Sequence, residues 1–249
     1  MPSTDTLTIH YTRLADSYDR FLYYSDDFVR RQTRMMIDKL ALRAEDRFVD
    51  LGGGTGMYTL DIMQQVPLRH ATVVDPFPEM LAAIPADAGV EAVVATALDF
   101  SEQVRGYDKV LIKEAVHHVR DRARLFANLY RRLSPGGRLL LVHVPPQLDY
   151  PVFRAALERS KTWLCDPDDL TEELRAAGFS VERDGLDYRH ELPKEHYFRM
   201  VENCYMSVLT SFSEEELQAG LREMAERYKN TDTLTFNDHF DYLTAVKPE

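Results

Sequence analysis

The chain has 249 residues, of which 45% are hydrophobic and 29% are charged. This composition is typical of a folded globular protein and excludes a disordered or fibrous chain. The 41 acidic residues outnumber the 30 basic ones, and a net charge of −11 is repelled by nucleic-acid backbones and anionic membranes, so we expect neither as a partner.

The first 43 residues are predicted to be helical. The segment of about 8–43 divides into two helices, and in FVRRQTRMMIDKLAL the apolar side chains gather on one side with the arginines largely on the other. We therefore expect the chain to begin with a helical cap.

From residue 47 onward, short apolar runs alternate with helical patterns, as expected of a parallel sheet that is covered on both faces. The predicted strands are Arg47–Leu51, Thr72–Asp75, Val90–Ala95, Lys109–Lys113 and Arg138–Val144. The predicted helices are Met57–Val66, Pro78–Ile84, Ser101–Arg105 and Asp121–Leu133. This alternation predicts an α/β fold with right-handed βαβ units and a doubly wound, mostly parallel sheet.

Two further strands, Phe179–Glu191 and LTFNDHFDYLTAVKP, bring the predicted sheet to seven strands. Helical patterns over 193–229 separate these last two strands. We expect this insertion to form a lid over the carboxyl edge of the sheet, where open α/β sheets bind ligands. The prediction is one domain over 1–249, made of a cap (1–43), a core (44–192 and 230–249) and a lid (193–229).

The two cysteines, Cys165 and Cys204, stand at no metal-ligand spacing. A disulfide framework is not indicated, and a reducing cytoplasm is the expected location. The first residues lack the basic and apolar regions of a secretion signal, and no apolar run approaches the ~18 residues of a membrane span. We expect a cytoplasmic protein without a metal centre.

A glycine-rich turn follows the first predicted strand, in VDLGGGTGM. Glycine lets a cofactor approach the backbone closely because it has no Cβ. Gly52, Gly54 and Gly56 alternate after Asp50, whereas the dinucleotide fingerprint requires its third glycine at the position of Met57. The turn therefore disfavours an NAD-dependent oxidoreductase.

Asp75 ends the second predicted strand, 25 residues after Asp50. A carboxylate at this position can accept hydrogen bonds from both hydroxyls of a ribose. The alternative role is to cap the helix that starts near Pro78. Together with the glycine turn, this spacing favours ribose binding.

These features resemble those of the class I S-adenosylmethionine-dependent methyltransferases, whose fold is Rossmann-like. The resemblance covers about 45–145 and includes LSPGGRLLLVHV and KEAVHHV. It implies S-adenosyl-L-methionine as the cofactor. The implied cofactor-binding residues are Tyr11, Tyr18, Asp50, Gly52, Gly53, Gly54, Gly56, Asp75, Pro76, Met80, Thr96, Ala97, Leu98 and Lys113.

Two parts of this implied site have alternatives. Many members of the family carry an aspartate that binds the adenine, where this chain has Thr96, so Asp99 or a backbone carbonyl near Ala97 can take that role instead. The resemblance implies that Tyr11 and Tyr18 bond the methionine carboxylate. Their spacing of seven also suits two aromatic residues that dock an amphipathic helix.

Methyl transfer from a sulfonium is an in-line displacement that needs no metal, and alignment of the reactants supplies much of the rate. An acceptor that carries a proton also needs a base, and His117 and His118 follow the fourth strand, where the acceptor should approach. The alternative for at least one of them is a structural role. A zinc site of both histidines with Glu114 is disfavoured because adjacent histidines rarely converge on one ion.

The predicted lid carries basic and aromatic side chains in RHELPKEHYFRMVENCYM. This surface suits a small anion with an apolar tail, and its tyrosine rings can stabilise a developing cation. The alternative is a solvated helix face. The predicted catalytic residues are His117, His118 and Tyr197, and the predicted substrate-binding residues are Glu114, His117, His196, Tyr197 and Arg199.

The sequence thus predicts a methyltransferase that uses S-adenosyl-L-methionine on a small-molecule acceptor, such as a secondary metabolite, and that can form a homodimer. Oxygen, nitrogen, sulfur and carbon acceptors all remain open. The alternatives are a cofactor-binding regulatory protein without turnover, a protein-modifying methyltransferase and an NAD-dependent oxidoreductase.

Overall fold

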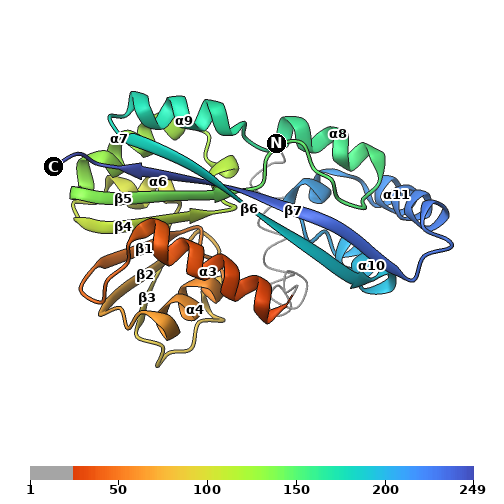
Figure 1. Ribbon diagram of the computed structural model, residues 1–249, viewed down its shortest axis with the longest axis horizontal. Coiled ribbons are helices and arrows are strands. Elements are labelled where there is room, and N and C mark those ends of the chain that lie inside the picture. Colours follow the sequence, from red (N-terminus) through yellow and green to blue (C-terminus); the bar gives the residue numbers. More distant parts are fainter. Residues whose placement is uncertain (1–24) are drawn as a thin grey trace.

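The computed structural model describes residues 25–249 (Figure 1). The first predicted helix, with Tyr11 and Tyr18, lies outside the described residues. No described helix is long and apolar enough to cross a membrane.

The described residues form one seven-stranded sheet in the order β3-β2-β1-β4-β5-β7-β6. Strand β7 runs antiparallel to both of its neighbours, and the remaining neighbours pair in parallel. This topology confirms the predicted doubly wound, mostly parallel α/β fold. The strands are β1 (Arg47–Leu51), β2 (His70–Asp75), β3 (Val90–Val94), β4 (Tyr107–Lys113), β5 (Leu133–His143), β6 (Ser180–Pro193) and β7 (Thr233–Val246).

Helices cover both faces of the sheet. The helices are α3 (Asp26–Leu40), α4 (Met57–Gln65), α5 (Pro78–Leu81), α6 (Ala97–Glu102), α7 (Arg122–Arg132), α8 (Arg154–Trp163), α9 (Pro167–Ala176), α10 (Lys194–Glu202) and α11 (Glu214–Arg227), with the 3-10 turns η1 (Val116–His118) and η2 (Ser207–Ser211). Helices α3 and α4 bury their apolar residues against one face, and α6, α7 and α9 pack on the other (Figure 1).

Helix α3 shows how local sequence sets one of these covering helices. Ser25 caps its N-terminus by accepting a hydrogen bond from the backbone N–H of Phe28, and Asp26 and Asp27 complement the helix dipole in the first turn. Phe28 and Met36 lie in the core, on the apolar side that the sequence predicts.

Strands β6 and β7 are each 14 residues long and extend beyond the other strands. Within β7, only Asp241–Val246 pair with β5. The rest of β7 pairs, among the described residues, only with Leu186–Pro193 of β6. The resulting two-stranded ribbon carries α10, η2 and α11, which we call the lid segment (193–229) (Figure 1). The insertion of helices before the last strand is therefore confirmed.

Strand β5 begins at Leu133, earlier than the predicted start at Arg138. Leu133 pairs with Tyr107 and Arg138 pairs with Lys109, so the register shifts between the two pairs. The segment LSPGG therefore forms an irregularity within β5 and does not mark the start of the strand.

Two helices also differ from the prediction. Helix α6 begins after Thr96 rather than at Ser101, because the Thr96 side chain caps it by accepting a hydrogen bond from the backbone N–H of Asp99. Helix α8 is not predicted from the sequence, since its N-cap is Phe153, which makes no side-chain cap. Phe153 instead packs against α11, where a Cβ on Gly220 would lie 2.4 Å from its ring.

Candidate functional site

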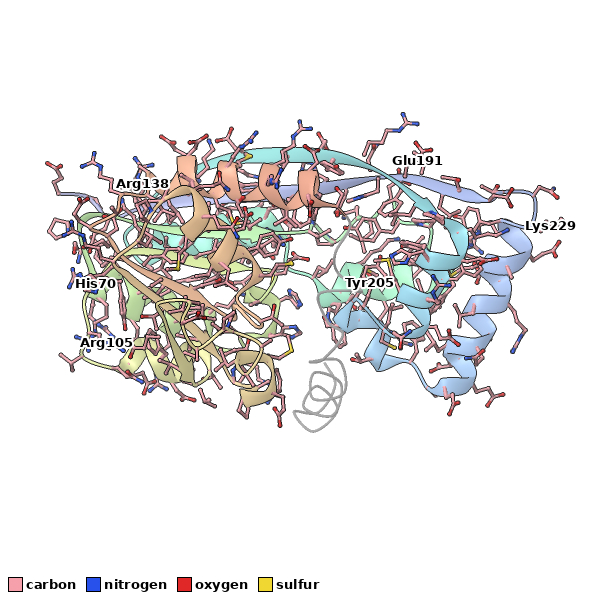
Figure 2. All side chains as sticks on the ribbon, turned by 90° about the horizontal axis from the view of Figure 1, so that it is seen from below. His70, Arg105, Arg138, Glu191, Tyr205 and Lys229 are labelled. Atoms are coloured by element: carbon pink, nitrogen blue, oxygen red, sulfur yellow. The ribbon has the colours of Figure 1, made fainter. Side chains whose placement is uncertain are left out.

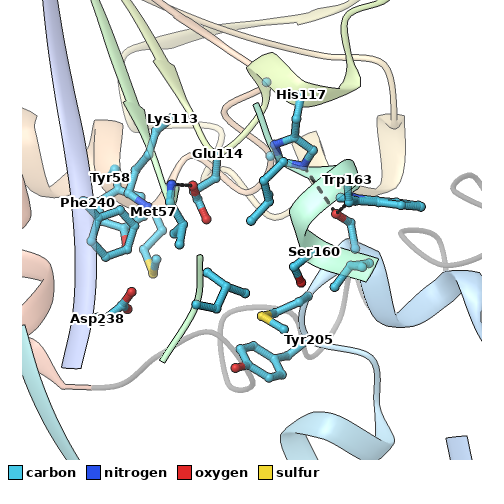
Figure 3. A pocket seen from close by; sticks show the side chains of 18 of the residues that line it. Met57, Tyr58, Lys113, Glu114, His117, Ser160, Trp163, Tyr205, Asp238 and Phe240 are labelled. Carbon is cyan, nitrogen blue, oxygen red and sulfur yellow. Dashed lines mark hydrogen bonds between the residues drawn. The ribbon is translucent and has the colours of Figure 1, made fainter. Parts of the chain in front are cut away.

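A pocket of about 160 Å³ opens at the carboxyl edge of the sheet, between the glycine turn and the lid segment. Figure 2 shows Tyr205 on the side of the lid segment that faces the sheet, with Lys229 at its far end. The polar side chains that line the pocket are Asp50, Thr55, Lys113, Glu114, His117, Ser160, Ser207 and Asp238. Figure 3 labels Lys113, Glu114, His117, Ser160 and Asp238 among them. The aromatic side chains that line it are Phe28, Tyr58, Tyr150, Trp163, Tyr205 and Phe240.

The glycine turn forms the floor of the pocket with a backbone that no other residue type could adopt without strain. Gly52, Gly54 and Gly56 have φ values of 78°, 55° and 74°. A Cβ on Gly52 would lie 2.5 Å from the Cβ of Ala115, and one on Gly53 would meet three atoms at 2.8 Å. The turn thus leaves its backbone bare toward the pocket, which fits a ligand that approaches the main chain closely.

Asp50, at the end of β1, links the glycine turn to α4. It is buried, and its carboxylate accepts a hydrogen bond of 2.7 Å from the Thr59 hydroxyl on α4. Burial raises the pKa of Asp50 to about 6, although the Thr59 hydrogen bond opposes the shift. Asp50 therefore ties β1 to α4 while it lines the pocket.

Asp75 supports the turn from β2. Its two carboxylate oxygens each accept a backbone N–H at 3.0 Å, one from Gly54 and one from Phe77. Burial raises the pKa of Asp75 to about 6. Phe77, not Asp75, is the N-cap residue of α5. A carboxylate oxygen has about two acceptor sites, so each oxygen can accept one further hydrogen bond.

Several other residues of the implied cofactor site are not part of the pocket lining. Met80 is buried with its methyl group beside Gly54, and Pro76 is exposed. The Thr96 hydroxyl donates to Asp99 at 2.7 Å while it caps α6. Of the predicted cofactor residues that the structure describes, Asp50, Gly52–Gly54 and Lys113 line the pocket, whereas Gly56, Asp75, Pro76, Met80 and Thr96–Leu98 do not.

The carboxyl end of β4 places two ionisable side chains in the pocket. The Lys113 ammonium lies 4.4 Å from the ring centroid of Tyr58 and 4.9 Å from that of Phe240, and burial lowers its pKa. Glu114 has a φ of 55°, and its carboxylate accepts a 2.9 Å hydrogen bond from the backbone N–H of Val144. Burial raises the pKa of Glu114. The unusual backbone of Glu114 thus directs its carboxylate into the pocket (Figure 3).

The predicted histidine pair follows on η1. The ring centroids of His117 and His118 lie 4.1 Å apart, but only His117 lines the pocket. Its Nε2 lies 3.4 Å from the Ser207 hydroxyl, which also accepts a 3.0 Å hydrogen bond from the Trp163 indole (Figure 3). Burial, followed by the nearby His118 and His143, lowers the pKa of His117 well below 6.5. His117 is therefore neutral at pH 7.

Three predicted residues of α10 lie outside the pocket lining. Tyr197 is buried, and its hydroxyl lies 2.9 Å from that of Tyr205, which does line the pocket. Arg199 is exposed and His196 is half-buried. Among the described residues, Lys113 is the sole basic lysine or arginine of the lining, so the structure does not bring the predicted basic helix face to the pocket.

Sequence reasoning missed Asp238 on β7. It is buried, accepts a hydrogen bond from the Tyr150 hydroxyl, and has a carboxylate oxygen 3.3 Å from His190 Nε2. A signal existed, because Phe236, Asp238 and Phe240 alternate along the strand, which places the acid on its apolar face. Trp163 and Ser207 were also missed, and they carry no comparable local pattern.

The described residues contain no group of three or more histidines, cysteines or acids that could hold a metal ion. The glycine turn, which leaves main chain facing the pocket, fits an organic cofactor that approaches the backbone closely.

Comparisons with known proteins identify the family of this chain. A methyltransferase domain family matches residues 22–184, more than half of the chain. An uncharacterized methyltransferase of Mycobacterium tuberculosis is 39% identical over 110 residues, which cover 43% of each chain. A demethylmenaquinone methyltransferase of Thermus thermophilus is 31% identical over 144 residues, which cover 55% of this chain and 64% of the relative.

Solved structures share the fold. Phosphoethanolamine N-methyltransferase 2 of Haemonchus contortus, in complex with S-adenosyl-L-methionine, superposes with a TM-score of 0.58 at 20% identity and covers 88% of this chain and 53% of that one. The chain thus spans less than two thirds of the length of each of these three relatives. The family match itself covers most of the sheet, the glycine turn and the end of β4, and the chain belongs to the methyltransferase domain family.

Proposed function

We propose that this chain is an S-adenosyl-L-methionine-dependent methyltransferase that acts on a small-molecule acceptor, such as a secondary metabolite. One observation carries the proposal: a single pocket joins the bare glycine turn to a set of aromatic rings from α8, the lid segment and β7. When bound, the cofactor supplies an electrophilic methyl group for in-line displacement.

The turn and its two supporting acids form the cofactor half of the site. Gly52–Gly54 bring backbone close to the ligand, and Asp75 offers one free acceptor site on each oxygen to the ribose hydroxyls. Asp50 keeps the turn in place through Thr59. The adenine contacts and the roles of Tyr11 and Tyr18 stay predictions.

The aromatic rings form the acceptor half. Trp163 and Tyr205 lie across the pocket from Tyr58, which follows the glycine turn on α4 (Figure 3). An acceptor held beside these two rings would lie against the cofactor and be shielded from water. Holding two reactants in line is the main contribution that such an enzyme needs to make. The lid segment covers this half, which favours a small acceptor over a protein surface.

The lining residues also indicate which side chain acts as the general base when the acceptor must lose a proton. His117 lines the pocket, but its Nε2 contacts Ser207 and its Nδ1 is buried. Glu114 presents a carboxylate whose pKa is raised by burial, which brings it closer to the value that suits a general base at neutral pH. We therefore assign the base to Glu114 in place of the predicted histidine pair.

Two predictions from the sequence and one inference from the pocket lining complete this proposal. Residues 1–43, 44–192 with 230–249, and 193–229 are assigned as cap, core and lid. A cytoplasmic location is supported by two free cysteines, Cys165 and Cys204. A flat acceptor agrees with the aromatic lining and with the name of the Thermus thermophilus relative, which specifies demethylmenaquinone.

Titration calorimetry of the full chain with S-adenosylhomocysteine and, separately, with NADH tests the proposal. We expect binding of the first and none of the second, and the reverse result would refute the methyl-donor assignment. A screen of metabolite extracts with a methyl-deuterated cofactor then identifies the acceptor through a product of increased mass. Cofactor binding without any methylated product would favour the regulatory alternative.

A further inference from the structure

The Ser207 hydroxyl stands at a junction of three elements in the acceptor half of the pocket. Trp163 on α8 donates its indole N–H to Ser207 Oγ at 3.0 Å. His117 on η1 places its Nε2 3.4 Å from the same oxygen. Ser207 itself begins η2 of the lid segment, is half-buried and lines the pocket.

The surroundings of His117 decide which way this junction is hydrogen-bonded. Its Nδ1 is buried and has no hydrogen-bond partner among the described residues. A proton on Nδ1 would be a buried donor without an acceptor, which is rarer in proteins than a buried acceptor without a donor. The proton of the neutral ring therefore belongs on Nε2, from which it is donated to Ser207.

Ser207 Oγ then accepts two hydrogen bonds, one from the indole N–H of Trp163 and one from the Nε2–H of His117. An indole N–H can only donate, so the Trp163 bond has no other direction. The hydroxyl hydrogen of Ser207 has no acceptor among the residues that the structure describes. Two donors on one oxygen polarise its O–H bond and strengthen it as a donor.

We propose that Ser207 donates a hydrogen bond to an oxygen atom of the acceptor, and that Trp163 and His117 are positioning residues for this contact. The acceptor class is then an aromatic molecule with a phenolic or carbonyl oxygen, because rings line the pocket and a protonated amine has no lone pair to offer. This inference rests on the proposed methyltransferase function and narrows its substrate class.

The tautomer of His117 is tested by nitrogen-15 NMR of the full chain, with the ring signal assigned by its loss in His117→Gln. We expect the wild-type ring to be neutral with the proton on Nε2. A proton on Nδ1 would overturn the proposal, because the Ser207 hydrogen would then be used by His117. In Ser207→Ala we expect the Nε2–H population to fall, since its acceptor is removed.

The second test uses two probes that differ by one oxygen, 4-fluorophenol and fluorobenzene, and follows their binding by fluorine-19 NMR with S-adenosylhomocysteine present. We expect wild type to bind 4-fluorophenol about tenfold more tightly than fluorobenzene, the scale of one hydrogen bond to a ligand. Ser207→Ala should abolish this preference, and Ser207→Thr should retain it. Thr162→Ala, which removes an exposed hydroxyl of α8, is the matched control and should change nothing.

The two proposals fail in different ways. If S-adenosylhomocysteine binds but wild type shows no preference between the probes, or binds neither, the Ser207 assignment is overturned and the methyltransferase proposal stands. If S-adenosylhomocysteine does not bind, the proposed function itself is overturned.

Discussion

The tightest contact of the glycine turn yields a quantitative prediction for Gly52→Ala. Gly52 has a φ of 78°, and placing an L-residue in this region costs roughly 1–2 kcal/mol. The new Cβ would also lie 2.5 Å from the Cβ of Ala115, well inside the usual ~3.5–4.0 Å contact of two carbons. Both carbons are attached directly to the main chain, so no side-chain rotation relieves the overlap. Overpacking of this kind costs roughly 1–3 kcal/mol, and we expect a total loss of roughly 2–5 kcal/mol.

Gly54→Ala is the matched control for this prediction. Its φ of 55° carries a similar backbone cost, but its Cβ would meet the terminal methyl of Met80 at 3.1 Å, and that flexible side chain can move aside. We expect Gly54→Ala to lose only roughly 1–2 kcal/mol. The double variant Gly52→Ala with Ala115→Gly removes the clashing methyl and should recover roughly 1–3 kcal/mol.

Urea unfolding followed by far-UV circular dichroism measures these free energies, with the slope of each transition checked for two-state behaviour. Equal losses for Gly52→Ala and Gly54→Ala would refute the steric argument, since only the shared backbone cost would remain. So would a failure of Ala115→Gly to restore stability to the double variant.

Three further predictions concern the ionisable groups of the site. Asp75→Ala should weaken S-adenosylhomocysteine binding by roughly 1–3 kcal/mol in calorimetry because ribose acceptors are lost, and an unchanged affinity would reject that role. The pKa of Asp50 is about 6 in the folded chain, above its ordinary value, so its burial destabilises the protein progressively as the pH rises from about 4 to 6. The stability of Asp50→Asn relative to wild type, from urea unfolding, should therefore rise by roughly 1–3 kcal/mol between pH 4 and pH 7, and a pH-independent difference would contradict the shifted pKa. For an acceptor that loses a proton, Glu114→Gln should lower kcat by roughly 10²–10⁴ and remove the fall of activity below the raised pKa of Glu114; a retained acidic limb would assign the base elsewhere.

The sheet and its order of elements could be predicted because the relevant signals are local. Each buried parallel strand is a short apolar run, and the covering helices are amphipathic. The positions of these strands and helices along the chain can therefore be predicted without knowing which elements they pack against. Boundaries were less accurate where a tertiary contact decides them. The bulge before Arg138 depends on pairing with Tyr107 and Lys109, which lie far away in the sequence.

The residues of the acceptor half could not be found in the same way. The sequence favours Tyr197 because it lies in a helix rich in polar and aromatic residues, but the fold buries its side chain, with its hydroxyl against that of Tyr205. Helix α8 is not predicted because no side chain caps its N-terminus. Trp163, which lies on this helix, is therefore not predicted either. Asp238 is the exception, since its place in the alternation of β7 marks it as an acid on an apolar face.

The sequence by itself predicted the cofactor half of this protein, because the alternating glycines and Asp75 each lie within a few residues of a strand end, where local backbone geometry fixes their places. Only the tertiary structure decided the acceptor half. Its central junction joins His117 to Ser207 across 90 positions of the chain, and Trp163 to Ser207 across 44. Such contacts form when the β6–β7 ribbon brings the lid segment back over the sheet, and no local pattern encodes which side chains then meet.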